Sequence, residues 1–412
     1  MIRLVLFAVA SLAAQVGNLN TYAIPAVPSL PAAGGTYVDS TFGTTVMRIT
    51  DAGTDGGGYC YHDYAYWDVF NLDNTKLTVS CSSPARYWFE FNPLTFTLGA
   101  KHSFPNTPDG VQPTGDSVLQ WSSLYSNRAL VIGVSSMKIF ELNVDTGIYT
   151  TLKTFTTGLP TGTTSISTTS IDRQDNVFSI LTYGGSGVTG CMVWQRSTDT
   201  ILYTVTTSNT HSCLISKTGR YFLIQYDITP PDGAGIHVVD LQNGNLDTGL
   251  TDDAPDYGPR GHKDFSTYGI ASFQPYWPSP YGAKTWRLLT ALTATSALTG
   301  LSDSDGHVSC RNDDGEWCTS EYYRVGSDGI PPIQQEIFSY SLDGYQRVRR
   351  YVHHHSSPDV AGTDAYRAQP QANISRDGRF VTFNSTMGPA SDRIDVYVSR
   401  GSLKAAGMSG AF

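Results

Sequence analysis

A unit of about fifty residues recurs along this 412-residue chain and constrains its fold more than any other feature. Each copy has a few apolar or small residues, a polar turn, and then an alternating run typical of a β-strand. The clearest copy runs from Ile374 through Ser375-Arg376-Asp377-Gly378 into Phe380-Val381-Thr382-Phe383. The turns of the seven copies are centred on Asn74, Asn127, Asn176, Gly219, Gly269, Gly315 and Gly378.

The mean step between these turns is about 51 residues, close to the length of a four-stranded propeller blade. Second hairpins, such as those at 139–147 and 236–244, supply the outer strands. The sequence therefore predicts an all-β, seven-bladed β-propeller of four-stranded antiparallel blades. A strand within 37–49 would complete the seventh blade and close the ring. A β-sandwich or two smaller β domains is the alternative.

The composition excludes several other classes of protein. Only 15% of the residues are charged and 12% are aromatic, which disfavours coiled coils and disordered chains. The formal net charge is −9 and the basic residues are scattered, so nucleic acid is not expected as a partner.

The N-terminus has the pattern of an export signal. Arg3 precedes the apolar run 4–12, and Ser11-Leu12-Ala13 offers a small-x-small cleavage site. We expect a signal peptide at 1–13, a linker at 14–36, a single propeller at 37–400 and a tail at 401–412. A buried first strand or an uncleaved anchor is the alternative. The predicted location is secreted, periplasmic or on the cell surface, with no later membrane span.

Six cysteines are present, and none forms a C-x-x-C motif. An even count in an exported chain indicates three disulfides. Pairing of neighbours would join Cys60 to Cys81, Cys191 to Cys213 and Cys310 to Cys318, although spacing alone does not fix the connectivity. Buried free thiols are the alternative for each pair.

Histidines recur just before the predicted innermost strands. His211, His262 and His307 lie seven or eight residues before their turn glycines, and His62 precedes the first-blade strand. His353, His354 and His355 lead toward the last blade, followed by Gln369 and Gln371. Because innermost strands surround the central channel, we expect these side chains to gather at one channel mouth.

Two chemistries need such a gathering. Imidazoles with an amide or carboxyl oxygen can hold a divalent ion, and an imidazole beside a cation can abstract a proton. The segment Arg260-Gly261-His262-Lys263-Asp264 offers a cation, a base and an orienting carboxylate, and Tyr257 and Trp277 are aromatic platforms suited to sugar rings. Capping of neighbouring strands by hydrogen bonds, or an ordinary solvated loop, is the alternative.

The chain resembles secreted propellers of the oligogalacturonate-lyase and ulvan-lyase kind. The residues that carry the resemblance are Ser375-Arg376-Asp377-Gly378-Arg379, Phe383-Asn384-Ser385, the His353–His355 run, Gln369-Pro370-Gln371, Gly261-His262 and Gly306-His307-Val308-Ser309.

This resemblance implies a polysaccharide lyase that cleaves uronate-containing glycans by β-elimination. It implies a divalent ion, manganese or calcium, held by His307, His353, His355 and Gln369. It also implies that His262 is the base and Arg260 its charge partner. We add His211 as a further catalytic candidate. The expected substrate contacts are Tyr257, Trp277, Tyr366 and Arg367, and the expected partner is an acidic polysaccharide or a cell-surface glycan.

Two other functions fit the same sequence. The first is a non-catalytic extracellular propeller that binds glycan or protein. The second is a structural component that self-assembles, because a propeller fold does not dictate its function.

Overall fold

The computed structural model describes residues 16–55, 57–82, 85–114, 118–133, 136–226, 236–243, 246–250, 262–274, 283–297, 306–313, 316–322, 333–345, 347–357, 365–388 and 393–400. The predicted signal peptide at 1–13 and tail at 401–412 lie outside the described residues. In the described part of the chain, no helix has the length and hydropathy needed to cross a bilayer.

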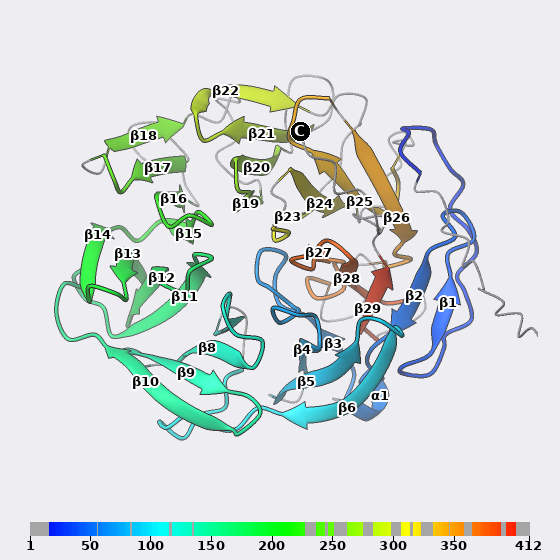
Figure 1. The fold of residues 1–412 in the computed structure, drawn as a ribbon, viewed down its shortest axis with the longest axis horizontal. Coiled ribbons are helices and arrows are strands. Elements are labelled where there is room, and N and C mark those ends of the chain that lie inside the picture. The colour runs from blue at the N-terminus through cyan, green and yellow to red at the C-terminus, as the bar shows by residue number, and fades with distance from the viewer. Residues whose placement is uncertain are drawn as a thin grey trace, which may run out of the picture.

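The described strands form six four-stranded antiparallel sheets and one five-stranded sheet. Figure 1 shows them arranged radially around a common centre, as the blades of a propeller. Each four-stranded sheet consists of four consecutive strands, and the first of them lies innermost. The prediction of an all-β propeller is confirmed.

The strands of the four-stranded sheets have the following bounds. Those of the first two sheets are β3 (Cys60–Tyr61), β4 (Lys76–Cys81), β5 (Ala85–Asn92), β6 (Thr97–Ser103), β7 (Leu119–Trp121), β8 (Arg128–Ile132), β9 (Lys138–Asn143) and β10 (Ile148–Thr154). Those of the next two are β11 (Ser165–Ile171), β12 (Val177–Gly184), β13 (Gly187–Gln195), β14 (Thr200–Thr206), β15 (Thr210–Ile215), β16 (Tyr221–Tyr226), β17 (Ile236–Asp240) and β18 (Leu246–Leu250). Those of the last two are β19 (Lys263–Phe265), β20 (Gly269–Gln274), β21 (Ala283–Leu288), β22 (Ala291–Ala297), β23 (Val308–Ser309), β24 (Trp317–Glu321), β25 (Glu336–Ser341) and β26 (Val348–His353).

The five-stranded sheet joins the two ends of the described chain. Its order is β1-β2-β29-β28-β27, built from β1 (Thr36–Val38), β2 (Thr45–Arg48), β27 (Asn373–Ile374), β28 (Phe380–Ser385) and β29 (Asp395–Arg400). In Figure 1 the blue β1 and β2 lie beside the red β29. The expected closure by an N-terminal strand is correct, but the prediction of seven four-stranded blades is not. Six sheets have four strands, and the closing sheet has five because two N-terminal strands join it.

Burial is high in inner strands and low in three of the outermost ones, although the outermost strand β26 is almost entirely buried. Every residue of β24, β25 and β28 is buried, because these strands are covered on both faces by neighbouring sheets. The outermost strands β6, β10 and β14 are mostly exposed or half-buried. The core therefore consists of apolar clusters between adjacent sheets. One packs Leu130 and Ile139 against Phe178 and Trp194.

The innermost strand of the first sheet is interrupted by a loop. β3 pairs with β4 through Cys60 and Tyr61, and pairing resumes only at Phe70, opposite Leu77. Residues 62–68, which we call the channel loop, leave the sheet between these points. In Figure 1 a blue loop following β3 lies at the centre of the ring. Its residues Tyr64–Trp67 pack against Leu214 and Phe265 of the innermost strands β15 and β19. The loop therefore fills the channel.

Side chains of the two neighbouring sheets hold the backbone of the channel loop and of the residue that follows it. The Asn373 side-chain amide donates to the carbonyl oxygens of Ala65 and Trp67, both at 2.7 Å. The Trp121 indole N–H donates to the Val69 carbonyl at 3.0 Å. Buried backbone carbonyls that leave a sheet need such partners, so these bonds stabilise the excursion.

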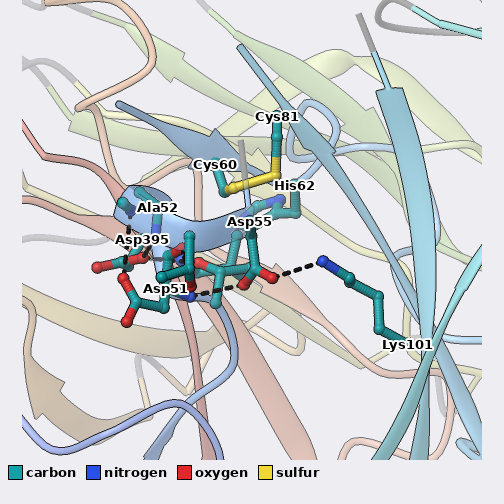
Figure 2. Close-up of a disulfide and its surroundings, with 12 residues drawn as sticks. Asp51, Ala52, Asp55, Cys60, His62, Cys81, Lys101 and Asp395 are labelled. Atoms are coloured by element: carbon teal, nitrogen blue, oxygen red, sulfur yellow. Dashed lines mark hydrogen bonds and ion pairs between the residues drawn. A yellow bond between two sulfur atoms is a disulfide. The ribbon is translucent and has the colours of Figure 1, made fainter. Parts of the chain in front are cut away.

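All three expected disulfides are present, and no described cysteine is free. Cys191 joins the sheet β11–β14 to Cys213 on β15 of the next sheet. Cys310 and Cys318 close the β23–β24 hairpin. Cys60 and Cys81 lie directly opposite each other on β3 and β4. Figure 2 shows this bond next to His62, near the one-turn helix α1 (Ala52–Asp55), so it anchors the start of the channel loop.

Candidate functional site

One mouth of the channel gathers two histidines and two tyrosines from four separate segments. His262 precedes β19, His307 precedes β23, Tyr64 belongs to the channel loop and Tyr366 lies before β27. The rings of His262 and His307 are 4.3 Å apart between centroids. Tyr64 lies 5.5 Å from His262 and 5.0 Å from His307. We call this end of the channel the histidine mouth. The predicted convergence of His262 and His307 is confirmed.

Tyr64 and His262 are directly hydrogen-bonded through the phenolic oxygen and Nδ1. Which atom donates depends on the imidazole tautomer. His262 is half-buried, whereas Tyr64 is buried. The imidazole therefore lies nearer to solvent, and the phenol fixes its orientation from below.

Glu321 orients His307 from beneath the mouth. One carboxylate oxygen of Glu321 lies 2.5 Å from His307 Nδ1 and accepts the His307 backbone N–H at 3.0 Å. The other accepts the backbone N–H of Ala372 at 3.0 Å. Both side chains are fully buried. Glu321, at the end of β24, thus links the segment that precedes β23 to the segment that precedes β27.

His62 is a buried, uncharged member of this region. Its backbone N–H donates to Asn384 Oδ1 at 3.0 Å, and its ring Nδ1–H donates to the Asp63 carbonyl at 2.6 Å. Burial lowers the pKa of His62 to about 4, so the imidazole is neutral near pH 7. It has a structural role in holding the channel loop against β28.

The segment before β27 supplies the accessible surface of the mouth. Tyr366 is 47% exposed and stacks on Tyr64 with 6.5 Å between centroids. The Arg367 guanidinium lies over the Tyr61 ring at 4.5 Å. Gln369 is half-buried, and its backbone N–H donates to the Tyr366 carbonyl at 3.2 Å. Three residues expected at the site therefore lie on one turn that borders the histidine mouth.

His353 and His355 make their ring contacts in a different group. Their rings are 6.2 Å apart, and Phe42 stacks on His353 at 5.0 Å. His353 Nδ1 lies 3.2 Å from an Asp39 oxygen, and its Nε2 lies 3.5 Å from Glu336. The reason is topological. His353 ends β26, the outermost strand of its sheet, whereas His307 precedes the innermost strand β23, roughly 14 Å away at three strand spacings.

The described side chains do not fit the metal site implied by the resemblance. A carboxylate on Nδ1, as at His307, is a common way to orient a metal-binding imidazole. However, no three His, Cys, Asp or Glu side chains of the described ranges gather closely enough to hold an ion. Within the described ranges, His307, His353, His355 and Gln369 are not brought to one point.

The structure gives less information about the other predicted site residues. His211 is exposed at a bulge between Thr210 and Ser212 of β15. Arg260, Tyr257 and Trp277 lie outside the described residues.

Two central residues were not predicted from the sequence, namely Tyr64 and Glu321. A signal for Tyr64 was available, because Tyr61-His62-Asp63-Tyr64-Ala65-Tyr66-Trp67 is unusually dense in aromatic and titratable residues. Glu321 has no local signal, since it lies at the end of an otherwise ordinary strand, Trp317–Glu321.

Comparison with known proteins supports the architecture. The chain is similar to the solved structure of an oligogalacturonate lyase in complex with manganese, with a TM-score of 0.64 and 11% identity over 90% of this chain and 97% of that one. It is also similar to an oligogalacturonate lyase from Vibrio parahaemolyticus, with a TM-score of 0.62 and 12% identity over 90% and 98% of the two chains. No family model and no curated protein sequence matches the chain. At these identities the likeness establishes the shared propeller fold.

Proposed function

We propose that the protein cleaves a uronate-containing polysaccharide or oligosaccharide by β-elimination at the histidine mouth. The observation that carries the proposal is the hydrogen-bonded pair of Tyr64 and His262, placed beside His307 at the channel opening. The fold shared with oligogalacturonate lyases supports the same substrate class.

The pair has the groups that β-elimination requires. The base removes the proton on the carbon next to the uronate carboxylate, and that electron pair forms the new carbon–carbon double bond as the glycosidic oxygen leaves. We assign proton removal to the half-buried His262, because a neutral imidazole is an effective base near pH 7. Tyr64 is assigned to orient the imidazole from its buried side, and the protonated His262 returns the proton to the leaving oxygen.

Local cations are needed because the whole chain carries a formal net charge of −9, which repels an anionic glycan. Arg367 is half-buried beside Tyr366, and we assign it to the uronate carboxylate. The exposed Tyr366 ring is assigned to the face of a neighbouring sugar. Arg260 belongs to the same proposal as a charge partner of His262.

Export is also part of the proposal. The three disulfides are consistent with an extracellular or periplasmic protein, since such bonds persist in oxidising compartments. The predicted signal peptide at 1–13 points the same way, and an extracellular glycan would then be accessible as substrate.

The test is formation of unsaturated uronate, followed by ultraviolet absorbance, across a panel of uronate glycans with and without manganese or calcium. His262→Ala is expected to reduce the rate by roughly 10²–10⁴-fold, the usual contribution of a positioned general base. His102→Ala is the matched control, because His102 is partly exposed on the outer strand β6 and pairs with Glu90. Absence of product from every glycan under every condition would refute the proposal.

A non-catalytic glycan-binding propeller is the second candidate. It is favoured by the Tyr366 ring, which is 47% exposed and stacks on the buried Tyr64 with 6.5 Å between centroids. This function predicts glycan binding without turnover, and binding that survives His262→Ala. Calorimetric titration of the same glycan panel distinguishes the two candidates.

A further inference from the structure

The opposite mouth of the channel carries a different set of residues at one repeated position. The second residue after each innermost strand lies in the turn at this end, and four of the seven such residues are cations. In the first sheet the position is counted from Phe70, where pairing with β4 resumes. In chain order the seven residues are Leu72, Ser123, Arg173, Lys217, Thr267, Arg311 and Arg376. Because leucine, serine and threonine also occupy this position, the turn itself does not require a charge. We call this end the cationic mouth.

Permanent charges converge here around one buried carboxylate. Arg311 binds Asp68, the last residue of the channel loop, through two bonds of 3.0 and 3.1 Å. Arg173 reaches the same carboxylate at 3.0 Å, and Arg376 Nε lies 3.8 Å from it. These cations lower the pKa of Asp68 far below its ordinary range, so it stays ionised.

Fewer carboxylates than cations form ion pairs here. The four cations face two buried acids, Asp68 and Asp264, whereas the buried Asp172 and Asp175 of the neighbouring turn accept hydrogen bonds from backbone N–H groups and Ser122. A third acid, Asp313, lies 2.9 Å from Arg173 Nε at the rim, and its side chain is 51% exposed. Burial raises the pKa of Asp264 to about 6, which weakens its contribution as a counter-ion.

Lys217 shows the excess most directly. It is only 7% exposed, and its ammonium donates to the backbone carbonyl of Asn312. Burial, followed by repulsion from Arg173 and Arg311, lowers its pKa well below the ordinary value. A buried ammonium held by one neutral acceptor is costly unless an anion joins it.

A cavity of about 330 Å³ opens beside these cations. It is lined by Ser123, Arg173, Lys217, Thr218, Thr267, Asp313 and Arg376. Arg376 is 4% exposed, and its buried Nε has no hydrogen-bond acceptor among the described residues. The cavity thus offers three cationic side chains and three hydroxyls, the groups that bind compact oxyanions.

The cations are held in place before any ligand arrives. The Arg173 backbone N–H donates to the Lys217 carbonyl at 2.9 Å, and the Asp313 N–H donates to the Arg376 carbonyl at 2.6 Å. The Arg376 guanidinium also donates to Ser123 Oγ. Such preorganisation lowers the entropic cost of binding.

We propose that the cationic mouth is a binding site for a compact oxyanion, such as a sulfate, phosphate or carboxylate group. The site lies at the other end of the channel loop from the histidine mouth and is independent of the lyase function. The anion bridges Lys217, Arg173 and Arg376, and Asp313 moves outward to admit it.

The test compares thermal unfolding and calorimetric titration of the full chain in sodium phosphate, sulfate and acetate against chloride of equal ionic strength. We expect a rise in Tm of roughly 3 °C at 100 times Kd for at least one anion. The anion that gives the rise identifies the group: acetate indicates a planar carboxylate, and sulfate or phosphate a tetrahedral oxyanion.

Two variants assign the effect to the site, and a third controls for it. Lys217→Met and Arg376→Gln are expected to lose the anion-dependent rise. Lys217→Met is also expected to raise the Tm in chloride, because it removes a buried amine whose desolvation is costly. Arg379→Gln lies in the same turn as Arg376 but pairs with Asp377 at the surface, and it is expected to keep the rise. If no anion shifts the wild type, or if both site variants keep the full shift, the proposal is overturned.

Discussion

The two ends of the channel loop face opposite kinds of chemistry. At the histidine mouth, Tyr64 contacts the imidazole rings of His262 and His307. At the cationic mouth, Asp68 meets guanidinium groups that stay charged at any physiological pH. The fold is the same at both ends, since each is a ring of residues flanking the innermost strands. The comparison shows that the residue type at a repeated position, and not the propeller itself, sets the chemistry of each mouth.

The largest stability effect is expected at the cationic mouth. Asp68→Asn leaves Arg311 and Arg173 without their shared counter-ion, and removal of one partner from a buried ion pair costs about 3–5 kcal/mol. Chemical denaturation measures the loss. Asp109→Asn is the control, because its pair with Lys138 lies at the surface and contributes less than about 1 kcal/mol. Equal losses in both variants would mean that Asp68 is not the organising charge.

The next effect concerns the anchor of the channel loop. Replacement of Cys60 and Cys81 by serine opens a loop of sequence separation 21, which is worth about 3 kcal/mol in unfolding free energy. The bond lies next to His62, so hydrogen exchange in the segment 61–67 is expected to accelerate as well. Unchanged exchange in that segment would show that Asn373 and Trp121 alone hold the loop.

A smaller, pH-dependent effect is expected from Asp264. Burial raises its folded pKa to about 6 from 3.8, so its stabilising contribution is full below pH 3.8 and is lost as the pH rises through about 6. The Tm of the wild type relative to Asp264→Asn should therefore fall between pH 4 and pH 7. The change in unfolding free energy is at most about 3 kcal/mol, at about 1.4 kcal/mol for each pKa unit. If the Tm of the wild type instead rises relative to that of Asp264→Asn over this range, folding lowers the pKa of Asp264 and does not raise it.

The smallest effect is expected for the exposed ring of the histidine mouth. Tyr366→Ala should weaken glycan binding by about 1 kcal/mol, a typical value for one stacking aromatic side chain. Tyr345→Ala is the control, because Tyr345 is 81% exposed at the turn before β26. Calorimetric titration should find a weaker affinity only for Tyr366→Ala, and equal affinities would remove Tyr366 from the site.

The repeat allowed most of the fold to be predicted. The period defined the blades, and the predicted hairpins at 139–147 and 236–244 correspond to β9–β10 and β17–β18. The five-stranded sheet was missed because one strand was expected within 37–49, whereas this part of the chain forms the two paired strands β1 and β2. A strand of three residues has too little alternation to be recognised in sequence.

The site was predicted only in part. Because His262 and His307 each precede an innermost strand, they were correctly predicted to lie close together. The same argument placed His353 wrongly, because it assumed that the histidine run leads into an innermost strand, whereas His353 ends the outermost strand β26. Tyr64 and Asp68 were missed because a repeat-based analysis does not reveal a loop that leaves one blade to fill the channel.

Cleavage of uronate glycans by His262 at the histidine mouth is the function that we propose for this protein. The most direct measurement is the rate of unsaturated-uronate formation by the wild type, His262→Ala and His102→Ala on the same glycan. We expect turnover by the wild type and His102→Ala, and a loss of roughly 10²-fold or more for His262→Ala. Equal rates for the three proteins, or no turnover by any of them, would contradict it.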